Sequence, residues 1–307
     1  MTDVVKLGVA EGLSTVQRSL WGDVWRQFYK HKGAVVGVVV FVLIGLSVFF
    51  GPYLYDVDPN AIDFRARNLS PNFEHPLGTD NIGRDTMAAM LAGGQVSLAV
   101  GFLAMVIALL LGTLVGVLAG FIKALDSPLM RLTDLFLSLP LLPLLLVSIM
   151  LFRDPLRTLY GPENGIFILI VFMIGITSWM HTARIVRGDV LGIKEREFVL
   201  AAHSIGARRR KIIFRHILPN ILSPIMVSAT LGIANAIITE SALSFLGLGF
   251  PPDFPTWGRL LYDGTKFIQI TPSRVIWPGL FIALTVLSVN YIGDGLRDAL
   301  DPRLRGR

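Results

Sequence analysis

Long apolar segments, separated by shorter polar ones, dominate the chain from residue 33 onward. A helix that spans the hydrocarbon core of a bilayer needs about 20 mostly apolar residues, because it rises only about 1.5 Å per residue. Segments of this kind occur at 33–55, 86–122, 135–152, 164–183, 216–239 and 275–293. The second and the fifth exceed one crossing, so part of each is expected to be tilted or to lie outside the core. The pattern predicts an all-α polytopic membrane protein with six transmembrane helices.

The composition supports this prediction. Hydrophobic residues make up 53% of the 307 residues and the mean hydropathy is +0.62, whereas ordinary soluble domains are about 45–50% apolar even with Gly included. The absence of cysteine excludes disulfides and thiolate metal sites. The net charge of +6 suggests nucleic acid at first, but the basic residues lie beside the apolar segments. No nucleic-acid partner is therefore expected.

Lys and Arg are distributed unequally between alternate loops. The residues before 33, the segments 123–131 and 184–215 and the tail after 293 together hold 20 of them, whereas the opposite side holds eight. Because cytoplasmic loops carry the excess of positive charge, both termini are predicted to be cytoplasmic. The first apolar segment is predicted to be a retained helix, because it is longer than the apolar core of a signal peptide, which has about 7–15 residues.

The loops divide the predicted chain into four parts. Residues 1–32 form a cytoplasmic N-terminal segment, and residues 33–93 contain the first transmembrane helix and an external region rich in Asp, Asn and Pro. Residues 94–298 form a five-helix core with a basic cytoplasmic loop at 184–215, and residues 299–307 form a cytoplasmic tail. The core and its basic loop are therefore the regions in which function is expected.

Two of the apolar segments contain residues that shape helix packing. Gly112, Gly116 and Gly120 recur at every fourth position, a spacing that lets another backbone approach closely in lipid. Internal packing is favoured over a dimer face. Pro140 and Pro143 remove backbone donors and are expected to bend the third helix. Such a bend suits either a pathway that opens and closes or a rigid bundle.

Two carboxylates fall at or near membrane depth, where such groups usually face a protein interior or a water-filled cavity. Asp134 can pair with Arg131, three residues before it, which favours a structural role. Glu240 has no basic residue within two turns. It can accept hydrogen bonds from Ser241, Ser244 or a neighbouring helix, or it can line a pathway. Asp134 and Glu240 are the two candidates for the translocation path.

Sequence motifs of catalysis are absent. The patterns H-E-x-x-H, G-x-S-x-G and G-x-x-x-x-G-K-[ST] do not occur, and the five histidines have no common ligand spacing. We therefore expect no catalytic residue, no metal site and no enzyme activity in this chain. Energy for uphill transport would come from a separate ATPase subunit or from an ion gradient.

The segment REFVLAAHSIGARRRKIIFRHILPN at 196–220 combines a helical apolar face with a run of positive charge. Four residues share the spacing i, i+3, i+4 and i+7: Phe198, Ala201, Ala202 and Ile205. A short helix with a compact apolar face exposed in the cytoplasm has the form of a plug for a groove on another protein. Gly206 is expected to end this helix in a left-handed conformation. The charges at 208–211 are expected to anchor the next helix to anionic lipid rather than to contact a partner.

This segment resembles the cytoplasmic loop of binding-protein-dependent ABC importer permeases, whose general signature is E-A-A-x3-G-x9-I-x-L-P. The matching positions hold Ala201, Ala202, Gly206, Leu218 and Pro219. Leu200 and His216 depart from the signature, and both departures look like the oligopeptide/dipeptide and nickel branch. HPLGTDNIGRD from His75, TDLFLSLPLLP from Thr133 and ESALSFLGLGF from Glu240 look like signatures of the second permease subunit of that branch. The resemblance covers nearly the whole chain.

The resemblance implies a type I ABC importer permease-like fold in a bacterial or archaeal inner membrane. The implied partners are a second homologous permease, two ATP-binding subunits, an external solute-binding protein and membrane lipid. No cofactor is expected in this chain, because ATP and Mg would bind to the partner subunits. By position, Ala201, Ala202 and Gly206 would contact the ATPase, and Leu218 and Pro219 would fix the loop to its helix.

Peptides are the commonest cargo that the resemblance implies. Nickel chelates, glutathione and oligosaccharides travel through similar permeases and remain alternatives. A self-contained secondary transporter that uses Glu240 as a proton or cation site is less favoured, because the two halves show no inverted pair of broken helices.

Overall fold

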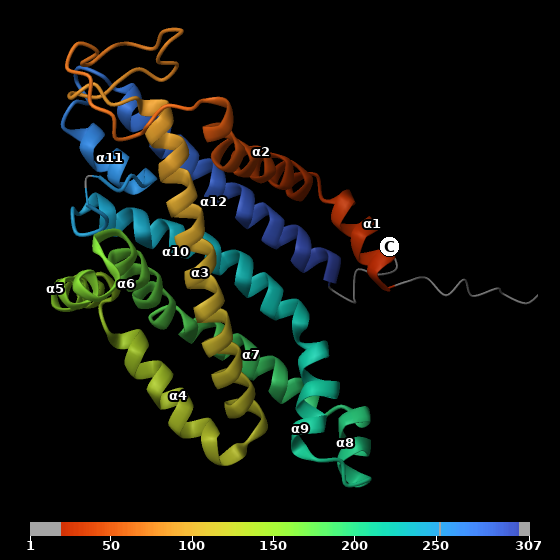
Figure 1. The fold of residues 1–307 in the computed structure, drawn as a ribbon. Coiled ribbons are helices and arrows are strands. Elements are labelled where there is room, and N and C mark those ends of the chain that lie inside the picture. The colour runs from red at the N-terminus through yellow and green to blue at the C-terminus, as the bar shows by residue number, and fades with distance from the viewer. Residues whose placement is uncertain (1–19, 252, 301–307) are drawn as a thin grey trace, which may run out of the picture.

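The computed structural model describes residues 20–251 and 253–300, and in this part of the chain every regular element is a helix (Figure 1). The first half contains α1 (Leu20–Lys30), α2 (Lys32–Leu54), α3 (Thr86–Phe121), α4 (Lys123–Ser138), α5 (Leu141–Tyr160) and α6 (Pro162–Ile176). The second half contains α7 (Trp179–Lys194), α8 (Glu197–Ser204), α9 (Arg209–Ile212), α10 (Leu222–Phe245), α11 (Trp257–Thr265) and α12 (Ser273–Leu300). A π-helical turn (Ile213–Ile217) and a 3-10 turn (Leu218–Asn220) join α9 to α10.

Five stretches within the described residues are long and apolar enough to cross a membrane. They are α2, α3, α6 together with α7, α10 and α12, and the bent pair α4–α5 makes a sixth if it is counted as one span. The predicted all-α polytopic membrane fold is confirmed.

The third predicted helix, 135–152, is wrong as a single element. The chain breaks between α4 and α5, which meet at an angle of 85°, and α5 continues through a charged stretch to Tyr160. Pro140 is the N-cap of α5, so the break falls where the proline ring cannot continue α4. Pro143 lies in the first turn of α5, where a missing backbone N–H costs no helical hydrogen bond.

The fifth predicted helix is displaced along the sequence. The prediction was 216–239, whereas α10 begins at Leu222 and continues to Phe245. Residues 213–220 instead wind as a π turn followed by a 3-10 turn. Pro219 lies in the 3-10 turn and has no N–H to offer to an α-helical ladder. As a result, Glu240 lies inside α10 rather than at its end.

Helix α3 is the centre of the bundle and packs against α2, α6, α7 and α10. Its glycines make the close approach to α7 possible. A Cβ added to Gly112 would lie 2.7 Å from the carbonyl oxygen of Trp179, and one on Gly116 would lie 2.7 Å from that of Ala183. A Cβ on Gly120 would lie 2.7 Å from Cβ of Val190. The expected internal packing of the three glycines is confirmed.

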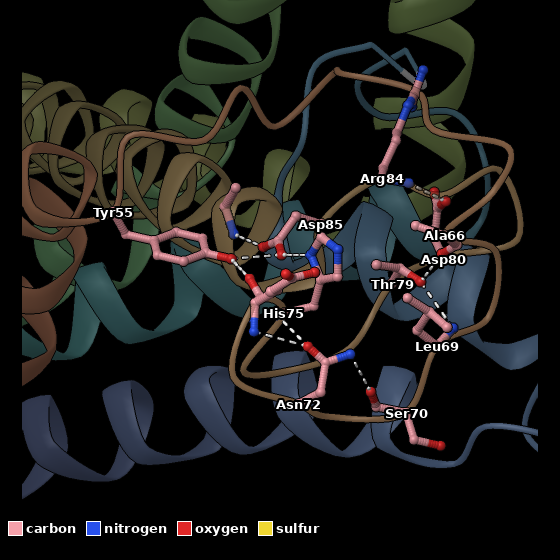
Figure 2. Close-up of polar contacts among 12 residues, drawn as sticks. Tyr55, Ala66, Leu69, Ser70, Asn72, His75, Thr79, Asp80, Arg84 and Asp85 are labelled. Atoms are coloured by element: carbon pink, nitrogen blue, oxygen red, sulfur yellow. Dashed lines mark hydrogen bonds and ion pairs between the residues drawn. The ribbon is translucent and has the colours of Figure 1, made fainter.

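The two ends of the bundle differ in character (Figure 1). At one end, α8 and α9 form a small helical projection. At the other end, the irregular segment 55–85 and the short helix α11 form a cap. The close-up in Figure 2 shows polar contacts that connect residues within segment 55–85.

Asp85 is the centre of this cap. Its Oδ1 accepts a hydrogen bond from the backbone N–H of Ala88 at 2.7 Å and so caps the N-terminus of α3. Its Oδ2 accepts a hydrogen bond from the Tyr55 hydroxyl and lies beside Nδ1 of His75, each at 2.7 Å (Figure 2). Burial, together with this contact to Asp85, raises the pKa of the Tyr55 hydroxyl above its usual value of 10.0.

The tight turn at residues 80–84 is also held by a carboxylate that accepts backbone hydrogen bonds. Oδ1 of Asp80 accepts hydrogen bonds from the backbone N–H groups of Ile82 and Arg84, both at 2.8 Å. Gly83 has a φ of +84°, and a Cβ there would lie 1.7 Å from the carbonyl oxygen of Asp63. Only glycine fits this position, so the turn is fixed by its backbone as well as by its side chains.

Candidate functional site

Helix α8 has one buried face and one exposed face. Val199 and Ala202 are buried and pack with Ile212 and Ile217 in an apolar cluster that continues onto α3 and α7. The opposite face is open to solvent and includes Ile205, which is 84% exposed. Its other exposed members are Phe198, Leu200 and Ala201. The projection thus shares an apolar cluster with the bundle and has a free apolar surface.

The predicted apolar face must be corrected for one residue. Ala202, only 6% exposed, lies in the inner cluster instead of on the open surface. The spacing i, i+3, i+4, i+7 spreads over part of the helix circumference, so one member of the set can point inward while the others point outward. Ala202 therefore seats α8 on the protein, and Phe198, Ala201 and Ile205 form the free face.

The C-terminal end of α8 has the expected geometry. Gly206 has a φ of +75°, which is the predicted left-handed conformation. The backbone N–H of Ala207 donates to the carbonyl of Ala202 at 3.1 Å, as in a Schellman motif. A Cβ on Gly206 would meet nothing within 4 Å, so the restriction at this position comes only from the backbone.

The turns that follow α9 attach the projection to α10. Leu218 packs partly against the apolar cluster under α8, whereas Pro219 is exposed. The side-chain amide of Asn220 donates to the carbonyl of His216 at 2.7 Å. Residues 208–211 are exposed, as expected for a basic anchor beside a membrane.

A cavity of about 600 Å³ lies between the α4–α5 break, the α6–α7 junction and α10. Its polar members are Thr177, Ser178, His181, Thr182, Ser228, Asn235 and Thr239. Its apolar members are Phe136, Leu137, Leu139, Leu141, Leu144, Met180, Ile185, Leu231 and Gly232. Cavities of about 300–1,000 Å³ are typical of ligand sites. None of these lining residues is an Asp, Glu, Lys or Arg.

Glu240 lies outside this lining. It is 0% exposed; its Oε1 accepts a hydrogen bond from the Ser244 hydroxyl at 2.8 Å and its Oε2 accepts one from the Ser97 hydroxyl at 3.3 Å. The backbone N–H of Trp257 donates to the same Ser97 hydroxyl at 3.2 Å. The carboxylate thus joins α10, α3 and α11.

The predicted pairing of Asp134 with Arg131 is wrong. Asp134 instead forms an ion pair with Arg184 on α7. A second pair, Asp126 with Arg187, also joins α4 to α7, with one N–O distance of 2.8 Å. Because α4 packs alongside α7, these arginines of α7 reach the carboxylates of α4. Because Asp134 is exposed, the pair adds only about 0–1 kcal/mol to stability. Asp134 also does not line the cavity.

The cavity residues were not singled out from the sequence. The available signal was polarity inside an apolar segment: Asn235 and Thr239 interrupt α10, and His181 lies at the start of α7. Which of these positions meet in space depends on the α4–α5 break, and the sequence predicted a bend at Pro140 and Pro143 but not its angle of 85°.

Two family models match the chain. The model described as "Binding-protein-dependent transport system inner membrane component" matches residues 108–306. The model described as "N-terminal TM domain of oligopeptide transport permease C" matches residues 19–71. Together they include the cavity, α8 and the first spanning helix.

Curated relatives match over almost the full length. The oligopeptide transport system permease protein OppC of Bacillus subtilis (strain 168) is 38% identical over 299 residues, which cover 97% of this chain and 94% of the relative. The dipeptide transport system permease protein DppC of Alkalihalophilus pseudofirmus is 38% identical over 288 residues, which cover 94% of this chain and 91% of the relative.

Among solved structures, the chain is similar to the MetNI methionine ABC transporter in an inward-facing conformation. The TM-score is 0.56 at 20% sequence identity, and the match covers 70% of this chain and 97% of that one. At this identity the likeness shows the fold.

Proposed function

The chain belongs to the family of binding-protein-dependent transport system inner membrane components, and on this premise we propose that it conducts peptides as one permease subunit of an ATP-driven importer. The observation that carries the peptide assignment is the 38% identity, over 97% of the chain, to a protein named as an oligopeptide permease. Nickel chelates, glutathione and oligosaccharides are the alternative cargoes that the uptake experiment below compares.

The free face of α8 is the docking surface for an ATP-binding subunit. Phe198, Ala201 and Ile205 present apolar area at the tip of the projection, which suits insertion into a groove on another protein. Gly206 ends the helix so that the tip stays short, and Leu218 and Pro219 attach it to α10. ATP and Mg bind to the partner subunits, and this chain supplies no nucleotide site and no enzymatic activity.

The cavity beside α10 is this subunit's share of the translocation path. The charge-free, partly polar lining described above suits passage of a polar solute through an apolar bundle. A second homologous permease would close the open side. Glu240 and Asp134, the two sequence candidates for the path, are assigned here to bracing the helices around it, because each is bonded to a neighbouring helix.

The positive charge of the α8 end and of both termini supports a cytoplasmic location for these parts. The cap formed by segment 55–85 then faces the external solute-binding protein.

Reconstitution tests the transport assignment. The chain is coexpressed with its partner subunits and placed in vesicles with the external binding protein, and uptake is measured for a labelled tripeptide, a nickel chelate, glutathione and an oligosaccharide. ATP-dependent uptake of the tripeptide is expected. Uptake that needs no ATP contradicts the importer, and ATP-dependent uptake of another cargo without the peptide contradicts the peptide assignment.

A substitution tests the docking surface. Ile205→Asp places a charge on the free face of α8 and is expected to reduce recovery of the ATP-binding subunit about tenfold or more, because a carboxylate is costly to bury in an apolar groove. Ile270→Asp is the matched control, since Ile270 is 73% exposed in the loop between α11 and α12, outside the α8 projection. Equal recovery with both variants would show that α8 does not dock.

A further inference from the structure

Several polar side chains of the cavity have no hydrogen-bond partner within the described residues. The Ser228 hydroxyl is buried and unpaired, on a residue that is only 8% exposed. His181 and Asn235 are exposed residues of the cavity lining. Their side chains form no hydrogen bond with the described chain. Ser228 and Asn235 lie seven residues apart on α10, and therefore on one face of that helix.

The membrane makes such unpaired groups costly. A polar group in the hydrocarbon region must find a partner in the protein or in a water-filled cavity, and an isolated one is unfavourable by several kcal/mol. A hydroxyl can bond to a carbonyl of its own helix, as Thr239 does to Asn235 at 2.7 Å. The amide of Asn235 and the imidazole of His181 have no such partner in the described chain. These groups are therefore available to a polar ligand.

The chemistry of these groups indicates the ligand. A primary amide offers donors beside an acceptor, and a neutral imidazole offers one of each. A peptide group likewise presents one N–H donor and one C=O acceptor. A fixed charge, by contrast, would select cargo by its side-chain charge, and the lining contains no Asp, Glu, Lys or Arg.

We propose that Asn235, His181 and Ser228 form a subsite that hydrogen-bonds the main-chain amide groups of a peptide in transit. The inference rests on the proposed function. It adds that the main chain of the peptide is the part that this subunit recognises. Since every peptide has the same main chain, this subsite accepts peptides with acidic, neutral or basic side chains alike. Leu231, which lies between Ser228 and Asn235 along the same helix face, lies against the cargo.

The test compares ATP-driven uptake of three labelled tripeptides, with acidic, neutral and basic side chains, by the complete complex in vesicles. Asn235→Leu is expected to slow uptake of all three by the same factor, about tenfold, which corresponds to about 1.4 kcal/mol of lost hydrogen bonding. The binding protein is identical in both measurements, so its own preferences cancel in the ratio of variant to parent. His181→Leu is expected to act in the same direction, and His181→Gln, which keeps a donor and an acceptor, to restore most of the rate.

Asn290→Leu on α12 is the matched control, because it makes the same chemical change in a span that does not line the cavity. A loss that differs between the three peptides, or that is no larger than for Asn290→Leu, overturns the subsite. If the parent complex takes up no peptide, the proposed function itself has failed, so the two failures are distinguishable.

A second measurement is independent of whether Asn235→Leu folds. A photoreactive residue, Leu231→p-benzoylphenylalanine, is expected to cross-link to a labelled peptide during ATP-driven uptake, and the same residue placed at Leu287, which is exposed on α12 outside the cavity, is not. Intact uptake without a cross-link at position 231 overturns the proposal.

Discussion

The cap formed by segment 55–85 and the cavity beside α10 contain the same kinds of polar side chain, but use them in opposite ways. In the cap, the side chains of Asn72 and Thr79 accept hydrogen bonds from the backbone N–H groups of His75 and Leu69. In the cavity, the side chains of Ser228 and Asn235 have no hydrogen-bond partner in the described chain.

The difference comes from the backbone. An irregular loop leaves many N–H groups free for side chains to bind, whereas a helix interior uses its N–H groups in its own ladder. The same residue type is therefore structural in a loop and available in a helix. This comparison predicts that substitutions in the cap cost stability and that substitutions in the cavity cost transport.

The largest effect on stability is expected for Asp85→Ala. This change removes the carboxylate that accepts hydrogen bonds from the N-terminus of α3 and from the Tyr55 hydroxyl, and it leaves these donors unpaired. The expected cost is about 3 kcal/mol, measured as a lower thermal midpoint of the purified complex. Asp56→Ala, at an exposed position of the same segment, is the control and is expected to change little. A midpoint unchanged by Asp85→Ala would show that the cap does not depend on this carboxylate.

A smaller effect is expected for Ser97→Ala. The Ser97 hydroxyl donates to buried Glu240 and accepts from Trp257, so its loss leaves a carboxylate less satisfied at the junction of α3, α10 and α11. About 2 kcal/mol of destabilisation is expected, because leaving a buried polar group unsatisfied costs about 1–3 kcal/mol. Unfolding in denaturant measures it. A variant as stable as the parent would mean that Glu240 finds another donor.

Tyr55→Phe is expected to cost about 1 kcal/mol, the value of one hydrogen bond. It is also expected to remove a pH dependence. The folded protein raises the pKa of Tyr55, so its stabilising contribution is complete below pH 10.0 and is lost as pH rises through the higher folded pKa. Thermal midpoints measured from pH 8 upward should fall less steeply for Tyr55→Phe than for the parent, and parallel curves would contradict the raised pKa.

The smallest effect on stability is expected for Ser228→Ala. Its hydroxyl is buried but unpaired, so removing it takes away no internal hydrogen bond. The change should stay within about 0.5 kcal/mol of the parent and can even be stabilising. Denaturant unfolding beside Ser97→Ala, the same substitution at a bonded serine, gives the direct contrast. A loss as large as that of Ser97→Ala would show that Ser228 has a structural partner.

The spanning helices and the left-handed end of α8 could be predicted because each depends on local sequence. Apolar length identifies a helix that crosses the bilayer, and Gly206 follows the last residue of an apolar face. The partner of Asp134 could not be predicted in this way, since Arg184 is fifty residues away. Nor could the inward direction of Ala202, because periodicity shows which residues share a face but not what that face contacts.

The cavity illustrates the same limit at a larger scale. Its lining combines the break at Pro140, the junction at Thr177 and one face of α10. Each feature is visible in the sequence as a proline or as a polar residue in an apolar segment. Their meeting depends on the 85° angle between α4 and α5, which the presence of a proline does not specify.

The glycine-mediated contact between α3 and α7 has a mechanical consequence. With backbone lying against side chains and carbonyls at Gly112, Gly116 and Gly120, the two helices have no flexible layer between them along which to slide. Only Glu195 and Arg196 separate the end of α7 from the start of α8. We therefore expect a displacement of α8 to be transmitted through α7 to α3, a rigid rod whose 36 residues span about 54 Å. The far end of that rod is Thr86, directly beneath the cap.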